Sequence, residues 1–376
     1  MIEYVEIRNP ETRKIIGICD TAKSIIWRSV YFGVGEFEIY APATPKYIDL
    51  LKIGNFVTRA NELNCGIIET IQITFNEQDG QMIVASGRFA KQILSRRIIY
   101  RFVKTYSVSP SVISGNVAEA CWRLIDENCG ASAPSYRQFP KFGRGTINHL
   151  PAVITDQNGE AARRQVTYEN LLEYTDGLLQ EYLYGSYVWL DTFTGDLQYV
   201  MYKGADRSAN NTEGNIPLIF SKENDNLLSS DFNETDAELK TTAIIGGEGE
   251  GLQRFIARVG DDAEGYERRE MFVDADGITK TVQEGETETT YTDEEYAVLL
   301  IADGKAAMKD RKKTSSFTGD IDLTQSRYVF GRDYFCGDII TVEDSTIGKR
   351  ANCRMVSIIE AQDENGYSVI AECETV

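Results

Sequence analysis

Three stretches of the chain carry the pattern of a helix, in which apolar residues recur every three or four positions. In the first, Cys121 lies on an apolar stripe with Leu124 and Ile125, and Gly130 follows it. Asn and Thr side chains commonly cap the first turn of a helix, because their oxygen accepts a hydrogen bond from a free backbone N–H group. The pattern therefore predicts helices over residues 116–129, 168–184 and 292–311, with Asn116, Thr167 and Thr292 as their N-caps.

Most of the remaining chain alternates between apolar and polar residues, which is typical of strands with one buried face. Residues 71–75 alternate in this way and lead to Asp79-Gly80, a dipeptide that favours a hairpin turn. Asn365-Gly366 predicts a second hairpin near the other end of the chain. Three further segments have a different character: long surface loops are predicted for residues 203–240, a flexible glycine-rich elbow for 246–251, and an acidic, solvated hairpin and loop for 260–292.

An internal repeat relates the two ends of the chain. Four segments recur in the same order, with offsets of 284, 283, 288 and 286 residues. In both copies a glycine precedes a strand in which two outward acidic residues alternate with two inward apolar ones. We refer to these acidic residues, Glu36, Glu38, Asp320 and Asp322, as the strand carboxylates. The corresponding segments are 35–39, 53–58, 64–68 and 79–80 in the first copy, and 319–323, 336–341, 352–356 and 365–366 in the second.

The repeat and the helices together predict a mainly β protein with helical insertions, in the α+β class. We expect two similar antiparallel β-barrels that arose by internal duplication. Helical material lies between them and also inside the second copy. The expected domains are residues 1–105 for the first β-barrel, 106–185 for the α-helical insertion, 186–258 with 312–376 for the second β-barrel, and 259–311 for an acidic insertion with one helix.

Composition narrows the range of partners. The 376 residues are 42% hydrophobic and 10% aromatic, enough for a large buried core. The chain contains no run of about eighteen apolar residues, so no membrane span is predicted. The first residues also lack the basic and apolar segments of a secretory signal. The net charge of −19 argues against specific nucleic-acid binding, which needs clustered cations. The charge is uneven: residues 1–200 carry 20 Lys and Arg against 22 Asp and Glu, whereas residues 201–376 carry 19 against 36.

Cysteine and histidine usage argues against a metal site. The seven cysteines are scattered, no Cys-x-x-Cys pair occurs, and His149 is the only histidine. Tetrahedral zinc sites need four such ligands at close spacing. The cysteines are therefore predicted to be small buried hydrophobic residues of a protein made in a reducing cytoplasm.

No segment carries a complete catalytic signature. No Gly-x-Ser-x-Gly motif surrounds a serine, and one histidine excludes any mechanism that needs two. Residues 246–251 lack the Gly-Lys-Ser/Thr ending of a phosphate loop, and their glutamates would repel phosphate. Residues 274–277 begin like a calcium loop, but Lys280 stands where ligands should continue. We therefore expect a protein that is not an enzyme, with no catalytic, cofactor-binding or metal site and no cofactor.

Several segments in this order resemble one known family. They are residues 33–42, 66–69, 86–99, 246–251 with Arg254, 270–275, 316–321, 330–334 and 336–342. The chain resembles the tail hub proteins of phages and prophages of Gram-positive bacteria, the ReqiPepy-type siphovirus tail protein family. These are similar to the trimeric hub of T-even phages and to the N-terminal part of tail-associated lysozymes. Cys336 departs from the expected leucine, and the sequence ends at Val376, where relatives continue into a peptidoglycan-cleaving domain, so we expect none here.

The resemblance implies a homotrimer at the tail tip, or baseplate, of a phage, prophage or phage-tail-like particle. It would be an adapter with a central channel, between a six-fold tail tube and a three-fold spike or fibre. Implied partners are the distal tail protein or tail tube above, a spike, fibre or tail lysozyme below, and the tape-measure protein. It implies synthesis in the bacterial host cytoplasm, location in the virion and a part in host cell entry, without a membrane anchor.

Two other classes of function stay open. The strand carboxylates would suit a peptidoglycan hydrolase, because glycosidases use paired acidic residues. A carbohydrate-binding β module would instead need an exposed aromatic platform. The candidates for such a platform are Tyr182, Tyr184, Tyr187 and Trp189.

Overall fold

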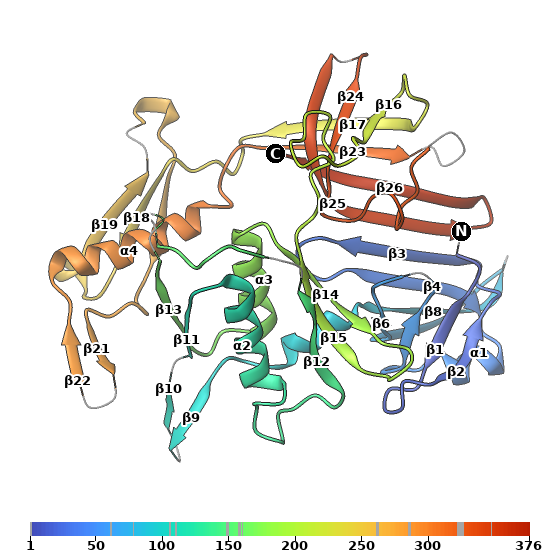
Figure 1. Cartoon of the computed structure of the whole chain (residues 1–376), viewed down its shortest axis with the longest axis horizontal. Coiled ribbons are helices and arrows are strands. Elements are labelled where there is room, and N and C mark those ends of the chain that lie inside the picture. The colour runs from blue at the N-terminus through green and yellow to red at the C-terminus, as the bar shows by residue number, and fades with distance from the viewer. Residues whose placement is uncertain are drawn as a thin grey trace. The chain divides into compact units, whose positions relative to one another are not determined.

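The computed structural model describes the chain except for residues 1, 61, 78, 105, 106, 110, 148, 149, 157, 158, 160, 261, 262, 285, 286, 322–326 and 347. Most of the described elements are strands, joined by a few helices (Figure 1). The mainly β architecture with helical insertions is therefore confirmed. His149 and Asp322 lie outside the described residues.

A ten-stranded sheet is the main structural element of the fold (Figure 1). Eight of its strands follow the order β17-β23-β26-β25-β3-β4-β8-β7, while β24 branches from β25 and β16 pairs with β24. In chain order these are β3 (Ser24–Val30), β4 (Glu36–Pro42), β7 (Thr70–Asn76), β8 (Gly80–Arg88), β16 (Ile219–Ser221), β17 (Leu227–Thr235), β23 (Thr314–Ile321), β24 (Ile339–Asp344), β25 (Lys349–Asp363) and β26 (Gly366–Thr375).

Both predicted hairpins are confirmed. Strands β7 and β8 pair antiparallel up to Asn76 and Gly80, and β25 and β26 up to Asp363 and Gly366. Gly80 and Gly366 both have positive φ, +76° and +119°, a backbone conformation that residues with a Cβ rarely adopt. The turn dipeptides therefore fix where each hairpin reverses.

The strand order of the sheet repeats itself. Strands β17-β23-β26-β25 are followed by β3-β4-β8-β7, and each set ends on the two strands of a hairpin. Strand β4 follows the glycine of the first repeat, and β23 contains the glycine of the second. Each is the second strand of its set. Their registers differ, because Glu36 pairs with Arg88, eight residues after Gly80, whereas Asp320 pairs with Ile370, four residues after Gly366. The described strands form open sheets, so the two closed barrels stay a prediction.

The two halves join where β25 pairs antiparallel with β3. Val30 lies opposite Ser357, and Ile25 lies opposite Gln362. On the first half, a smaller sheet of order β2-β1-β5-β6 completes a core with helix α1 (Pro45–Leu50). Its strands are β1 (Val5–Arg8), β2 (Ile15–Cys19), β5 (Phe56–Thr58) and β6 (Gly66–Ile67).

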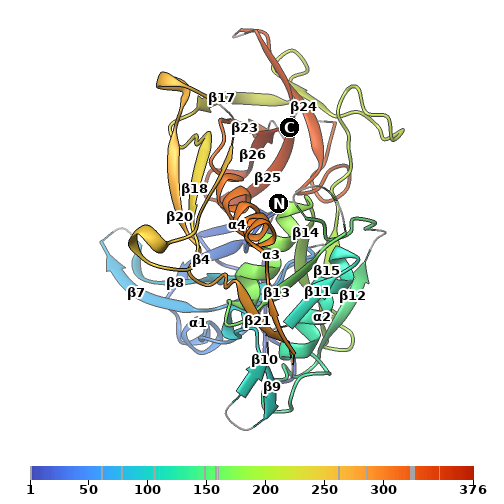
Figure 2. The same ribbon diagram turned by 90° about the vertical axis from the view of Figure 1, so that its left-hand side faces the viewer.

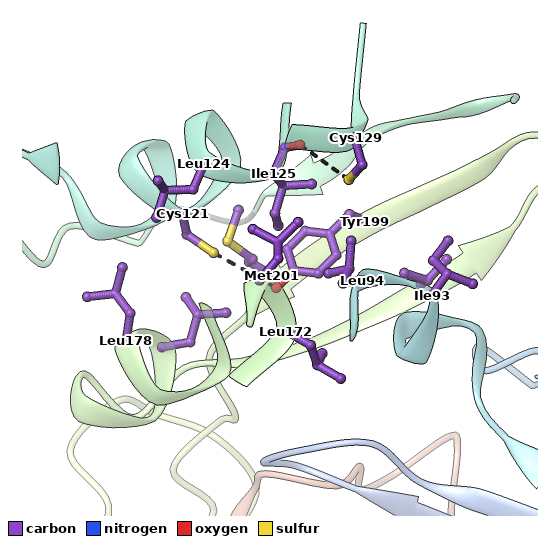
Figure 3. Close-up of a cluster of buried hydrophobic side chains, with 14 of the residues drawn as sticks. Ile93, Leu94, Cys121, Leu124, Ile125, Cys129, Leu172, Leu178, Tyr199 and Met201 are labelled. Carbon is purple, nitrogen blue, oxygen red and sulfur yellow. Dashed lines mark hydrogen bonds between the residues drawn. The ribbon is translucent and has the colours of Figure 1, made fainter. Parts of the chain in front are cut away.

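A second core packs around helices α2 (Val117–Cys129) and α3 (Leu171–Glu181) (Figure 3). In it the thiol of Cys121 lies 3.9 Å from the hydroxyl of Tyr199, and both residues are fully buried. Burial raises the pKa of the Cys121 thiol to about 12. All seven cysteines are free and buried, as predicted. The accompanying elements are η1 (Ala90–Arg96), β9 (Arg101–Lys104), β10 (Ser107–Ser109), β11 (Ser111–Ser114), β12 (Phe142–Ile147), β13 (Arg163–Val166), β14 (Gly185–Leu190) and β15 (Leu197–Tyr202).

The helix caps are confirmed for two of the three predicted helices. Asn116 accepts a hydrogen bond from the Glu119 N–H at 3.0 Å, and Thr292 forms a full capping box with Glu295 at the start of α4 (Asp293–Met308). The prediction for Thr167 is wrong, because Asn170 caps α3. Tyr168 has φ +64°, which cannot continue a helix.

Two loop predictions need correction. Residues 203–240 are not loop throughout, since they contain strands β16 and β17. Strand β16 pairs in parallel with β24, and its Phe220 is buried in the core. Residues 260–292 contain strand β20 (Glu270–Asp274) in addition to the expected hairpin, formed by β21 (Thr281–Glu284) and β22 (Thr287–Thr290).

The chain divides into two compact units. The larger comprises residues 1–154, 161–232 and 316–376, and the smaller comprises 155–160 and 233–315. In the smaller unit, α4 packs on a three-stranded sheet of order β19-β18-β20 (Figure 2). The remaining elements are β18 (Thr242–Gly246), η2 (Gly251–Gln253), β19 (Ile256–Gly260) and η3 (Gly265–Glu267). The four-domain division predicted from the sequence stays a prediction.

Candidate assembly surface

The strand carboxylates of the first repeat lie on the solvent-facing side of the long sheet. Glu36 and Glu38 are exposed, whereas the alternating Phe37 and Ile39 are buried in the core. This is the expected consequence of the two-residue period of a strand. The side chain of Asp320 lies outside the described residues, so its orientation stays a prediction.

Arginines on the same side of the sheet offset part of this negative charge. Arg28 of β3 lies 3.6 Å from Glu36 and 3.2 Å from Glu372 of β26. Arg88 of β8 pairs with Glu69 at 2.8 Å, and that hydrogen bond raises the pKa of the Arg88 guanidinium. The sequence pattern found the glutamates but missed Arg28, whose contacts follow from the pairing of β3 with β4 on one side and with β25 on the other. This side of the sheet is therefore a mixed, partly neutralised surface.

The two halves of the sheet are also held together by a buried ionic cluster. Arg59 donates hydrogen bonds to both carboxylate oxygens of Glu360, one of them at 3.1 Å, and to Glu62 at 2.6 Å. It also stacks 5.1 Å from the ring centroid of Trp27, which lies opposite Glu360. Burial lowers the pKa of Arg59, but the two carboxylates outweigh this effect and its net pKa is raised. Tyr367 donates a further hydrogen bond to Glu360.

The free edges of the sheet differ in composition from the junction of β25 with β3, where the ionic cluster is buried. Edge strand β7 contains no charged residue and exposes Ile73 by 50% and Phe75 by 71%. At the opposite edge, β17 exposes Leu228 by 64% but also carries Asp231 and Glu234. Apolar edge strands are usually guarded by charges or proline, since they can pair with other chains. The uncharged edge strand β7 is therefore the candidate assembly surface of the larger unit.

The glycine-rich segment 246–251 is held in place, so the prediction of a flexible elbow is wrong. Arg254 donates hydrogen bonds to the carbonyl oxygens of Gly247 at 3.1 Å and Gly246 at 3.0 Å. It also pairs with Asp274 and, at 2.8 Å, with Asp276. These two aspartates are the acidic residues of the calcium-like motif. Their carboxylate oxygens accept hydrogen bonds from the Arg254 guanidinium instead of facing a free site. Across the described part of the chain, no group of three or more His, Cys, Asp or Glu residues could hold a metal ion.

The candidate aromatic platform is not an exposed surface. Tyr184 is buried, and its hydroxyl accepts a hydrogen bond from the Ala152 N–H at 3.0 Å. Tyr182, Tyr187 and Trp189 are each partly covered, and the Tyr187 ring packs edge-on against Tyr202 at 5.6 Å. These residues serve the core instead of presenting stacked rings to a sugar.

Comparison with known proteins gives the family. The family model of the Siphovirus ReqiPepy6 Gp37-like protein matches residues 4–373, nearly the whole chain. The chain belongs to this family. The resemblance found in the sequence is therefore confirmed. A search of curated proteins found no match to this Gp37-like family member.

Solved structures share its fold. The 43 kDa tail protein of prophage MuSo2 from Shewanella oneidensis is 14% identical, with a TM-score of 0.57 over 99% of this chain and 98% of that one. A tail protein from Neisseria meningitidis MC58 is 12% identical, with a TM-score of 0.56 over 99% and 96%. At such identities the likeness shows the fold alone. Among the described residues of the Gp37-like chain, no helix is long and apolar enough to cross a membrane.

Proposed function

We propose that this protein is a structural component of the tail tip of a phage, prophage or phage-tail-like particle. It forms a trimeric baseplate hub that adapts a six-fold tail tube to a three-fold spike or fibre and encloses a central channel. Membership of the siphovirus family supports this proposal, as does the fold shared with two tail proteins, one of them from a prophage. The protein acts in the virion, during host cell entry, and is not an enzyme.

The observation that carries the proposal is the repeated strand order of the long sheet. Each chain contributes two four-stranded sets in the same order, β17-β23-β26-β25 and β3-β4-β8-β7. Three chains therefore supply six similar sets. A closed ring lets identical subunits bury their interfaces without leaving an edge that polymerises. Such a ring matches six-fold symmetry on one side and three-fold symmetry on the other.

The surface that carries Glu36 and Glu38 is the proposed channel wall. Negative charge there does not hold DNA, whereas a basic wall would bind phosphates and release their counterions. Arg28 and Arg88 reduce this charge without reversing it. The proposed partners are a distal tail protein or tail tube on one side, a spike, fibre or tail lysozyme on the other, and the tape-measure protein in the channel.

Electron microscopy with light scattering of the purified full chain tests the proposal. We expect a mass about three times 42.2 kDa and a ring with six lobes and three-fold symmetry. A chain that stays monomeric at every concentration and salt level, or a ring without three-fold symmetry, would contradict it. Robust clearing of cell walls that one carboxylate substitution abolishes would favour the hydrolase alternative.

A further inference from the structure

We infer that Arg13 and Lys141 form a binding site for a phosphate group, in the larger unit where the turn between β1 and β2 meets the turn between β14 and β15. The ligand is a tetrahedral oxyanion with about two negative charges, either free phosphate or the phosphoryl group of a larger molecule. The inference goes beyond the proposed tail function and does not depend on the formation of a trimer.

Gly195 marks the point where the two turns meet (Figure 1). A Cβ atom added to Gly195 would lie 3.2 Å from the Cβ of Arg13 and 3.4 Å from the Nζ of Lys141. The Lys141 ammonium is held over the same turn, because it donates a hydrogen bond to the Thr194 carbonyl oxygen at 3.2 Å. Two basic residues from distant parts of the chain therefore lie beside one glycine, and a side chain at that glycine would crowd both.

The Arg13 guanidinium is buried without a counter-charge. The residue is only 8% exposed, and its Nε has no hydrogen-bond partner among the described residues. Arg8, in the same hairpin, is also buried but pairs with Glu6. Arg13 instead lies 4.4 Å from the ring centroid of Phe56, which attracts the charge but supplies no oxygen for Nε. Burial lowers the pKa of Arg13, as expected for a cation that lacks a carboxylate nearby.

Backbone strain coincides with both basic residues. Arg13 has φ +62° and Lys141 has φ +55°, although residues with a Cβ rarely adopt this left-handed conformation. Two of the five described non-glycine residues with positive φ therefore meet at Gly195. Strain of this kind tends to cluster where a ligand is held, because the surrounding structure must fix the backbone against its own preference.

The acidic residues of the neighbouring turn do not neutralise the site. The Asp191 carboxylate accepts hydrogen bonds from the backbone N–H groups of Phe193 at 2.9 Å and Thr194 at 3.3 Å, so the turn itself uses it. Within the described part of the chain, neither Asp191 nor Asp196 pairs with one of the two cations. Two cations without a carboxylate suit a ligand with two negative charges, which favours a phosphate group over a single carboxylate.

Phosphorus-31 NMR of inorganic phosphate, titrated with the full chain at constant ionic strength, tests the site. We expect a saturable shift with a dissociation constant in the millimolar range. Arg13→Met should weaken binding at least ten-fold, because a charge-assisted hydrogen bond is lost, and Lys141→Met should weaken it at least three-fold. Lys305→Met is the matched control, since Lys305 is exposed and belongs to the smaller unit, and it should bind like the unmodified chain.

A variant that keeps both cations provides a second test, because the loss of buried Arg13 also affects packing. Gly195→Asn places a side chain against Arg13 and Lys141, and asparagine tolerates the φ of +77° better than most residues. It should reduce phosphate binding at least ten-fold with an unchanged circular dichroism spectrum. Equal binding of phosphate by this variant, by Arg13→Met and by the unmodified chain would contradict the inference, as would no binding by the unmodified chain.

Two further ligands define what the site accepts. Phosphate should raise the unfolding temperature of the unmodified chain, because it binds the folded state, whereas sodium acetate at the same ionic strength should not. An equal effect of acetate would mean that the site does not select phosphate and would overturn the inference. Glycerol phosphate distinguishes the two sources of the ligand: binding as tight as that of inorganic phosphate indicates the phosphoryl group of a larger molecule, and much weaker binding indicates the free ion.

Discussion

At the scale of single residues, the buried charged groups place the strongest constraint on which substitutions the fold tolerates. Arg59, Glu62 and Glu360 form an almost fully buried cluster, with side chains 10%, 9% and 6% exposed. Lys91 forms a second buried pair, 3.0 Å from Asp176 and 3.1 Å from the Ser186 hydroxyl. In such places a lost partner leaves a charge in a medium that solvates it poorly.

Replacing Glu360 tests the first of these clusters. Glu360→Leu should lower the free energy of unfolding by about 3–5 kcal/mol, because it leaves Arg59 buried with one carboxylate fewer. Urea denaturation measures the change. Glu181→Leu is the control, since the Arg164–Glu181 pair is about one-third exposed and should cost less than about 1 kcal/mol. If both variants lost a similar free energy of unfolding, the buried cluster would be no more sensitive to the loss of a carboxylate than the exposed pair.

The Asp176 carboxyl should titrate above its ordinary value. Desolvation raises its pKa, and its contacts with Lys91 and Ser186 only partly oppose this. Since the unfolded chain loses this proton first, near pH 3.9, the group's contribution to stability is lost as the pH rises from there through its folded pKa. Carbon-13 NMR of the carboxyl group measures the midpoint. A midpoint below about 3.9 would contradict the prediction.

At the scale of elements, local caps and turns decide where helices and hairpins begin. The start of α3 is set by Asn170, whose side chain accepts hydrogen bonds from the backbone N–H groups of Leu172 at 3.0 Å and Glu173 at 3.3 Å. Its amide also donates to the Ser95 carbonyl oxygen at 2.9 Å, so a contact with η1 holds the cap in place. The Thr167 hydroxyl has no hydrogen-bond partner among the residues that the structure describes.

These two residues form a matched pair for mutation. Asn170→Ala should cost about 1 kcal/mol of stability, because an N-cap is lost. Thr167→Ala should change it by less than about 0.5 kcal/mol, since its hydroxyl caps nothing. Thermal unfolding followed by circular dichroism compares them. A larger loss for Thr167→Ala would restore the cap that the sequence pattern predicts.

At the scale of the whole molecule, charge and assembly oppose each other. A trimer multiplies the net charge of −19 to −57, and this repulsion falls when salt screens it. Added salt should therefore strengthen the association of the subunits into a trimer.

A salt series tests this balance. Light scattering between about 0.05 and 0.5 M sodium chloride should show tighter trimer formation as salt increases, over a range in which the screening length falls below 10 Å. Glu38→Gln, which removes a carboxylate without an ion-pair partner among the described side chains, should reduce the salt dependence slightly. Dissociation of the trimer by salt would mean that ion pairs hold the subunits together.

The sequence alone determined the features that depend on a few neighbouring residues. The two hairpins, the caps at Asn116 and Thr292, and the outward position of Glu36 and Glu38 all follow from turn chemistry, capping and strand period. Of the repeated segments, 35–39 and 319–323 hold matching places in the long sheet, whereas 53–58 and 64–68 lie in the separate sheet that contains β5 and β6. Tertiary structure decided the rest, because contacts between distant residues leave no local signal. Arg59 meets Glu360 across 301 positions, Arg254 fixes a segment that glycine content alone marks as flexible, and η1 moves the start of α3 to Asn170.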